Sequence, residues 1–514
     1  MKVTRLRLAA GALLCAVLAG ALPVGAIPWL HSADEPSGRR LLAEGVTSIS
    51  LPIVGRNYLN PAHRMSRFGV GVPAIDATAV SLSALGRLNA GWYLDWTARA
   101  APSRPGGVTF AQLINLRDDG TSALSDASLA ATVEANPGTL WLVGNEPDSP
   151  LQNNVNPEQY ARAYHDLYRQ IKAADPTAIV SAGGIVQPTP LRLKYLDLIL
   201  QEYARLYGTQ MPVDVWNIHI YILREEKTGW GAFYPPGVAD EDGDALAIPY
   251  EIEDHIDIAI FRDMVVQFRQ WMATNGYREC PLILTEFGVI LPWDYFAPDL
   301  DDEEAKREAG YARVLAFMDA SVDYLLASTD PAIGCPYDSN RLVQRWAWFA
   351  LVGSWGGWLY EPDTGEMSVF GQRYAELAAA QPETINLMPV SLVAAAPAAQ
   401  PGVETTLLAT IVNNGEMPTT VPVVVRVYDG DPDGGGTQIG EARHAAPLDG
   451  GAGMAIVSVP WTPSEAKDYA LYVRVDPLDS IHETDEDDNT LAASVSVTVT
   501  HPAMLPIVIA SASS

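Results

Sequence analysis

Residues 66–385 of this 514-residue chain alternate between strand-like and helix-like segments. The strand-like segments are short, almost continuously apolar, and bounded by turn residues. Near-continuous apolar strands separated by helices are typical of a parallel sheet that is buried on both faces. In chain order the predicted strands are Arg67–Val72, Leu88–Asp95, Val108–Leu116, Thr139–Asn145, Ala178–Gly183, Val213–Ile220, Pro281–Thr285 and Arg345–Phe349.

Amphipathic helices are predicted between several of these strands. In Pro157–Ala174, apolar residues recur from Tyr160 to Ile171 with helical spacing and charged residues lie between them. Similar patterns cover Leu193–Tyr207, Asp257–Asn275 and Glu303–Leu326. Eight strand–helix units in roughly 320 residues favour a (β/α)8 TIM barrel, with its active site at the C-terminal strand ends. The competing doubly wound sheet would normally carry a glycine-rich phosphate turn after its first strand, and none is present.

A second domain is predicted at residues 387–500, where short alternating strands are separated by Gly, Asn and Asp turns. Strands at this spacing without helices indicate an antiparallel, immunoglobulin-like β-sandwich. The expected fold is therefore α/β, a TIM barrel over 66–385, followed by an all-β sandwich and a tail at 501–514.

The N-terminus has the pattern of an export signal. Basic residues precede an apolar run and a small-residue cleavage site, which predicts a signal peptide at residues 1–26 and a linker at 27–65. An uncleaved anchor is the alternative, but the run is short for a membrane span. We expect a secreted or cell-surface protein. The formal charge of −29 disfavours nucleic acid and anionic membranes as partners, whereas a neutral polysaccharide is compatible with it.

Two of the predicted strands end in a glutamate. Glu146 follows the fourth strand and Glu286 follows the seventh, 140 residues later (286 − 146). A buried, unpaired carboxylate is costly, so its presence at the end of a buried strand indicates a site. For each glutamate alone, helix capping or ion pairing is the alternative. Together, at the mouth of one barrel, they indicate glycoside hydrolysis.

The neighbours of these glutamates suggest different roles. A retaining glycosidase uses one carboxyl group as acid/base and another as nucleophile, about 5–5.5 Å apart. Asn145 is placed to hydrogen-bond a sugar hydroxyl beside Glu146, the expected acid/base. His219 and Tyr221, at the end of the sixth strand, could supply hydrogen-bond donors to an ionised Glu286, the expected nucleophile.

At these positions the chain resembles a known group of enzymes. Asn145-Glu146-Pro147 and Thr285-Glu286-Phe287-Gly288 resemble clan A glycoside hydrolases, and Trp216 to Tyr221 resembles a strand of family 128, whose known members act on β-1,3-glucans. The resemblance covers about residues 66–380 and implies an endo-β-1,3-glucanase with Glu146 as acid/base and Glu286 as nucleophile. Two features depart from the family: Ile220 replaces its usual aromatic residue, and residues 224–250 resemble an enlarged loop.

Aromatic residues near strand ends are candidates for stacking on sugar rings. We expect Trp92, Trp293 and Trp348 to bind substrate, with Trp293 the best placed because it lies on a loop between Pro292 and Asp294. Burial in the barrel core is the alternative for each of them.

Cys280 and Cys335 are the only cysteines after the signal peptide. In an exported protein such a pair is often a disulfide, with two buried thiols as the alternative. No cofactor or metal is expected. The acidic segments 240–244 and 429–436 lack the ligand spacing of a dedicated calcium loop, so solvated loops are favoured there.

The C-terminal domain resembles a CARDB domain through Val473–Pro477, Ile481–Thr490 and the turn Asn413-Asn414-Gly415. That resemblance implies contact with a cell surface or a glycan. For the whole chain we expect a retaining hydrolase of β-linked polysaccharide with a polysaccharide or oligosaccharide as its partner. The alternatives are a hydrolase of another β-linked glycan and a catalytically inactive carbohydrate-binding surface protein.

Overall fold

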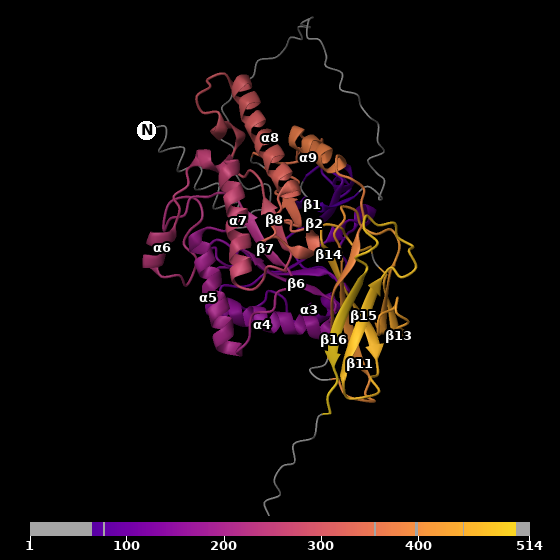
Figure 1. Ribbon diagram of the computed structural model, residues 1–514. Helices are drawn as coiled ribbons and strands as arrows, with labels where there is room; N and C mark the ends of the chain where they lie inside the picture. Colours follow the sequence, from indigo (N-terminus) through magenta and orange to yellow (C-terminus); the bar gives the residue numbers. More distant parts are fainter. Residues whose placement is uncertain (1–63, 76–77, 354–355, 396–398, 446, 500–514) are drawn as a thin grey trace, which may run out of the picture.

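The computed structural model describes residues 64–75, 78–353, 356–395, 399–445 and 447–499, and consists of an α/β part followed by an all-β part (Figure 1). The predicted signal peptide at 1–26 and the predicted tail at 501–514 lie outside the described residues, as does most of the predicted linker at 27–65. An α/β part followed by an antiparallel all-β part was expected, and this order of the two parts is confirmed.

The α/β part alternates strands with helices. In chain order its main elements are β1 (Met65–Gly71), α2 (Ala84–Arg87), β2 (Ala90–Leu94), β3 (Thr109–Phe110), β4 (Gln112–Ile114), α3 (Asp126–Glu134), β5 (Leu140–Asn145), α4 (Pro157–Ala174), β6 (Ile179–Gly184), α5 (Pro190–Tyr207), β7 (Trp216–Ile220), α6 (Asp240–Leu246), α7 (Ile258–Thr274), β8 (Leu282–Phe287), α8 (Glu303–Ala327), β9 (Arg345–Trp348) and α9 (Val369–Ala379).

The strands of this part are parallel to one another. One sheet has the order β3-β2-β1-β9-β8-β7 and a second has the order β4-β5-β6. The two sheets adjoin at both edges. Ala111 alone separates β3 from β4, and the parallel bridges Ser181–Val215 and Ile185–Ile218 join β6 to β7. Each of the eight predicted strand segments overlaps an observed strand, and the third overlaps both β3 and β4.

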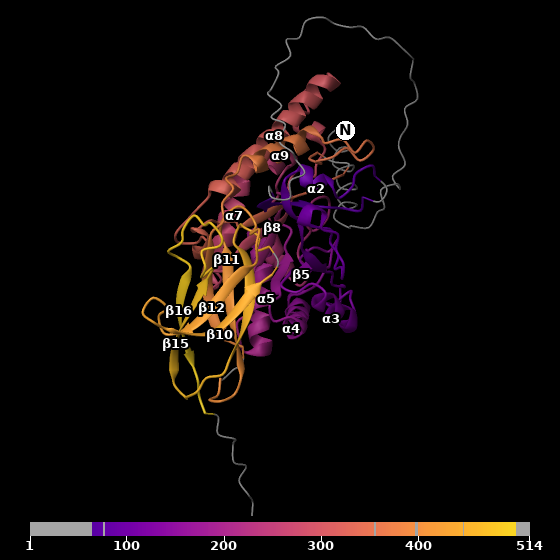
Figure 2. The ribbon, with the colours of Figure 1, turned by 90° about the vertical axis from the view of Figure 1, so that its right-hand side faces the viewer.

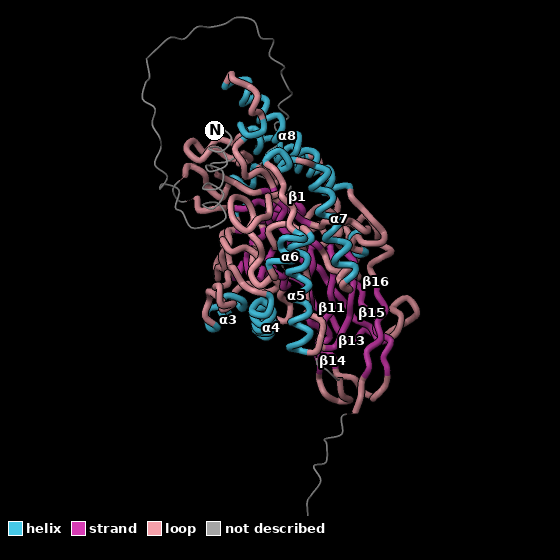
Figure 3. Tube along the Cα trace, turned by 90° about the vertical axis from the view of Figure 1, so that its left-hand side faces the viewer, coloured by secondary structure: helices cyan, strands magenta, loops and turns pink. Residues whose placement is uncertain are grey.

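The helices form where the apolar spacing predicts them. Helix α4 begins at Pro157 after a capping box made by Asn156 and Gln159, and it buries Tyr160 and Ile171 on one face. Helices α4, α5, α7 and α8 cover the strands on the side that faces the viewer in Figure 3. The side chains between strands and helices form one large core.

A second, smaller core lies among the strands and includes Trp92, Leu142 and Ile283. The all-β part covers one side of this core, because its residues Met454 and Ile456 pack against it.

The all-β part contains two antiparallel sheets, with strand orders β10-β11-β14 and β13-β12-β15-β16 (Figure 2). Its strands are β10 (Leu387–Ala394), β11 (Thr405–Asn413), β12 (Val423–Asp429), β13 (Thr437–His444), β14 (Gly453–Trp461), β15 (Asp468–Val475) and β16 (Thr490–Ser496). Alternate residues such as Val425, Val457 and Val473 point into a separate apolar core between the sheets.

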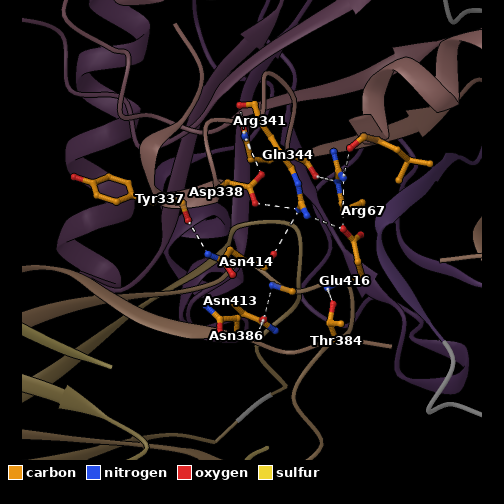
Figure 4. Close-up of polar contacts among 12 residues, drawn as sticks. Arg67, Tyr337, Asp338, Arg341, Gln344, Thr384, Asn386, Asn413, Asn414 and Glu416 are labelled. Carbon is orange, nitrogen blue, oxygen red and sulfur yellow. Dashed lines mark hydrogen bonds and ion pairs between the residues drawn. The ribbon is translucent and has the colours of Figure 1, made fainter. Parts of the chain in front are cut away.

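The all-β part is attached to the N-terminal ends of the parallel strands (Figure 4). Arg67 of β1 is fully buried, donates to the backbone oxygens of Gln344 (2.9 Å) and Val343 (2.7 Å), and forms an ion pair with Glu416 (3.5 Å). Arg345 at the start of β9 pairs with Asp449 at 2.8 Å. These contacts close the end of the sheet opposite to the strand ends that carry the two glutamates.

Within the described ranges, every helix is either too short or too polar to span a lipid bilayer.

Candidate active site

Glu146 occupies a constrained backbone position directly after β5. Its φ is 42°, in the left-handed region that a non-glycine residue rarely adopts, and its N–H donates to the oxygen of Gly184 at 2.9 Å. The neighbouring Gly183 permits this approach of β6 to β5, since a Cβ there would lie 2.7 Å from the oxygen of Gly144. The Glu146 side chain is consequently fixed at the C-terminal end of the strands, where it is 1% exposed.

Glu286 lies in β8, opposite His219 of β7 in the strand register. The pairing shifts between Ile218 and His219, which brings His219 level with this glutamate. One carboxylate oxygen of Glu146, one ring nitrogen of His219 and one carboxylate oxygen of Glu286 all lie within 4.8 Å of one another, and the three residues are buried. Two carboxyl groups from distant parts of the chain therefore share one small site.

Glu286 receives two strong hydrogen bonds. The indole Nε1 of Trp96 donates to its Oε1 at 2.6 Å, and the hydroxyl of Tyr221 donates to its Oε2 at 2.7 Å. Trp96 follows β2 with a φ of 56° and rests its ring edge-on against Phe349. Hydrogen bonds from fixed donors stabilise an ionised carboxylate.

Glu146 has a different environment. Its Oε1 lies 2.9 Å from Nδ1 of His219, whereas its buried Oε2 has no hydrogen-bond partner. Nε2 of His219 lies 3.0 Å from the hydroxyl of Thr285, and that hydroxyl lies 2.9 Å from Oδ1 of Asn217.

The donor and acceptor in each of these hydrogen bonds can be assigned from Asn217, the last acceptor in the series. Oδ1 of Asn217 can only accept, so the Thr285 hydroxyl donates to it and accepts from Nε2–H of His219. A neutral His219 then presents Nδ1 as an acceptor, and Glu146 must donate its own proton to it. The hydrogen-bond chain thus fits a protonated Glu146.

The electrostatics of the pair agree with that assignment. Burial raises the pKa of Glu146 to about 8, and the carboxylate of Asp148 acts in the same direction while Arg192 opposes it. The pKa of Glu286 is also raised, by burial and by the neighbouring Glu146, although His219, Tyr221 and Trp96 act in the opposite direction. Burial lowers the pKa of His219, which favours the neutral imidazole. Because Glu286 receives two hydrogen bonds from fixed donors, the arrangement favours a proton on Glu146 and a negative charge on Glu286.

Comparison with protein families gives two matches. Residues 71–230 match the family model described as the glycosyl hydrolase catalytic core. This part of the chain is therefore similar to a glycosyl hydrolase catalytic core. Residues 385–493 match the CARDB family model, and these residues cover most of the all-β part described above. No sequence among curated proteins matches the chain.

Solved structures similar to the chain include two GH128 endo-β-1,3-glucanases. The subgroup I enzyme from Amycolatopsis mediterranei, in complex with laminaritriose, is 20% identical, with a TM-score of 0.38 over 61% of this chain and 99% of that chain. The subgroup II enzyme from Sorangium cellulosum is 16% identical, with a TM-score of 0.39 over 60% and 98%. A CARDB domain from Pyrococcus furiosus, in complex with di-metal ions, is 19% identical, with a TM-score of 0.18 over 23% and 90%.

Within the α/β part, the structure separates the predicted aromatic residues. Trp92 is 2% exposed and points toward the N-terminal strand ends, where Arg345 lies over its ring at 5.5 Å. Trp348 is fully buried between the strands and α9, and its Nε1 donates to the oxygen of Gly357. The expectation that these two residues stack on sugar is therefore corrected: neither offers a ring face to a substrate.

Trp293 and Asn145 remain candidates for substrate binding. Trp293 is half-buried in the short helix Trp293–Phe296 after β8, with Tyr311 edge-on against its ring. Asn145 is buried at the end of β5, and its backbone N–H donates to Asn153.

The predicted disulfide is not formed, since Cys280 and Cys335 are free thiols. The sulfur of Cys280 faces the oxygen of Val213, and that of Cys335 faces the oxygen of Glu279. Burial raises the pKa of each thiol to about 12, which leaves both protonated and unreactive.

A cavity of about 310 Å³ lies at the junction between the catalytic core and the CARDB domain, where Arg345, His444 and Asp449 contribute to its lining. It is at the opposite end of the strands from Glu146 and Glu286, so it belongs to the domain junction and not to the candidate active site.

Proposed function

We propose that the chain is an exported retaining glycoside hydrolase of β-linked polysaccharide, with Glu286 as nucleophile and Glu146 as acid/base. The observation that carries this proposal is the pair of buried carboxylates within 4.8 Å, one receiving two donors and the other placed to hold a proton. A short separation suits a double displacement, since an inverting pair must leave room for a water molecule.

In the first step Glu286 attacks the anomeric carbon and Glu146 protonates the departing glycosidic oxygen, so the C–O bond breaks as a glycosyl ester forms. Trp96 and Tyr221 hold the attacking carboxylate in its ionised form. In the second step Glu146, now ionised, takes a proton from water as its oxygen attacks the same carbon, which releases Glu286 and restores the proton on Glu146.

As substrate we propose a β-1,3-glucan, cleaved at linkages inside the polysaccharide and not at its ends. The support is the resemblance of Asn145–Pro147 and Thr285–Gly288 to clan A glycoside hydrolases and of Trp216–Tyr221 to family 128. The enlarged segment at 224–250 leaves room for a preference among β-linked glucans that differs from other members.

The test is hydrolysis of a panel of β-glucans by wild type, Glu286→Gln and Glu146→Gln, with Glu158→Gln on the exposed face of α4 as control. We expect the control to match wild type on a β-1,3-glucan and both site variants to lose activity. NMR of the first products should show the β-anomer. Initial inversion would refute the retaining mechanism, and absence of hydrolysis on every glycan would favour a carbohydrate-binding protein.

The same proposal covers the remaining organisation. Residues 66–385 would form a (β/α)8 barrel, supported by the two adjoining parallel sheets, with a CARDB-like domain at 387–500 that contacts a cell surface or glycan. Residues 1–26 would be removed on export. N-terminal sequencing of protein collected from the medium should begin at Ile27; a start at Met1, or retention in the membrane, would contradict cleavage.

A further inference from the structure

A fully buried ion-pair network lies beside Glu146. Arg192, in the first turn of α5, forms ion pairs with Asp148 and, at 3.0 Å, with Glu225. The side chains of Arg192, Asp148 and Glu225 are all 0% exposed. With two carboxylates and one guanidinium, the network bears more negative than positive charge inside the protein.

One arm of this network holds the loop that carries Glu146. Asp148 lies two residues beyond Glu146, and its carboxylate accepts from the N–H of Val186 at 3.3 Å as well as from Arg192. Arg192 also donates to the backbone oxygen of Asp148 at 3.2 Å. The strained turn at Glu146 is thereby fastened to the loop after β6 and to the start of α5.

The other arm holds the segment 224–248, which contains α6 and follows β7 at the same end of the strands. Oε1 of Glu225 accepts from Arg192 and from the hydroxyl of Thr189 at 2.6 Å. Oε2 accepts from the N–H of Ile248 at 3.1 Å, which closes the base of the segment. Arg192 reaches into the segment itself, where its Nη2 donates to the oxygen of Phe233 at 2.8 Å.

A buried network of this kind is a poor source of stability, because well-packed apolar residues of similar volume often serve as well or better. Its bonds instead join three segments that are distant in the sequence and lie at the catalytic ends of the strands. The guanidinium fork suits this task, since its five donors have fixed directions.

We propose that Arg192 is a positioning residue: through Asp148 it holds the acid/base loop, and through Glu225 and Phe233 it fixes segment 224–248 as a rigid wall of the substrate site. The role of segment 224–248 in substrate binding rests on the proposed function. The effect of the Arg192 contacts on the rigidity of that segment can be measured without any substrate.

The test compares Arg192→Lys with Arg269→Lys in the full-length protein. Arg269 is the matched control, because it is also fully buried but donates to the backbone oxygens of Ile333, Cys280 and Arg278, away from the glutamates. Lysine retains the charge and loses the fork. Hydrogen exchange followed by mass spectrometry should be at least about tenfold faster across 224–248 in Arg192→Lys only. Unchanged exchange there, or equal acceleration in both variants, would overturn the proposal.

Should Arg192→Lys fail to fold, Glu225→Gln is the milder variant, since a carboxamide keeps one acceptor. The same local acceleration is expected, and its absence would again overturn the proposal.

Asp148→Asn tests the first arm by a carboxyl ¹³C titration of Glu146, assigned with Glu146→Gln. The groups facing Glu146 are His219, Glu286, Asp148 and Arg192. Loss of the Asp148 charge should lower the titration midpoint by about one pH unit, and an unchanged midpoint would remove this arm. If wild type hydrolyses no glycan, the proposed function fails while the exchange and titration results still decide the tie. If wild type is active, Arg192→Lys should raise KM more than it lowers kcat.

Discussion

Replacing Glu146 with glutamine should make the folded protein progressively more stable than wild type as the pH rises from about 4.5 to about 8. In the unfolded chain this carboxyl group titrates near 4.5, whereas burial raises its pKa in the folded protein to about 8. Between these values the folded state keeps a proton that the unfolded state releases. The stability linked to this group is therefore complete below pH 4.5 and declines as the pH rises through 8.

The magnitude follows from the displacement of the pKa. A difference of 3.5 units (8 − 4.5) at about 1.36 kcal/mol per unit corresponds to about 5 kcal/mol of unfolding free energy lost by wild type across this range. Glutamine does not titrate, so the variant lacks this loss. Glu286 adds to the difference in the same direction, since removal of the Glu146 charge also relieves repulsion between the two carboxyl groups.

The assay is urea unfolding of wild type and Glu146→Gln at several pH values from 5 to 8, with activity recorded in parallel. Glu158→Gln provides a control without pH dependence in this range, because Arg162 lowers the pKa of that exposed carboxyl group and it is ionised in the folded and unfolded states alike from pH 5 to 8. A stability difference between wild type and Glu146→Gln that stays constant over this pH range would refute the reasoning. It would mean that Glu146 is ionised at neutral pH and cannot serve as the acid.

Three further outcomes follow from the described contacts. Trp96→Phe removes a hydrogen-bond donor to Glu286 and should raise the pKa of that carboxyl group. The acidic limb of the kcat/KM pH profile should then move to higher pH, and kcat should fall about tenfold. An acidic limb at the wild-type pH would show that Trp96 does not stabilise the ionised Glu286. Glu416→Gln deprives two arginines of their buried partner at the domain junction and should lower the unfolding free energy by about 3 kcal/mol with kcat unchanged, as measured by urea unfolding and a rate assay; wild-type stability would argue against a fixed junction. Thiol titration of the denatured, unreduced mature protein should report both Cys280 and Cys335 as free, and a reading of none would restore the disulfide.

The strands and the two glutamates could be predicted because parallel strands buried on both faces form continuous apolar runs. A charged residue that ends such a run is visible without any tertiary information, and Glu146 and Glu286 were found in this way. The capped, amphipathic helix Pro157–Ala174 was predictable for a similar reason, since its spacing and its cap are both local.

The same continuity explains why Trp92 and Trp348 were misassigned. When both faces of a strand are apolar, alternation does not tell whether a ring points among the strands, as in Trp92, or toward the helices, as in Trp348. Trp96 directly follows the predicted strand Leu88–Asp95, and its position in the sequence does not indicate a contact with Glu286. Its contact with Glu286 depends on a left-handed φ of 56°, which no residue pattern announces for tryptophan.

Polar contacts between residues that are distant in the sequence could not be predicted either. Arg192 has the appearance of an ordinary charge in an amphipathic helix, yet it is fully buried between Asp148 and Glu225. The pairing of Cys280 and Cys335 depends on the directions of two Cβ atoms, and each sulfur instead faces a backbone oxygen.

The most direct test of the account is to trap the covalent intermediate. The protein is incubated with a β-1,3-linked glucose disaccharide that has a good leaving group and a 2-deoxy-2-fluoro substitution on the sugar that bears it. Proteolysis and mass spectrometry should then yield one peptide that carries the fluorinated sugar. We predict the label on Glu286 in the wild type and no label in Glu286→Gln. A label on Glu146, or turnover of natural substrate with inversion and no label, would contradict the assignment of the two glutamates.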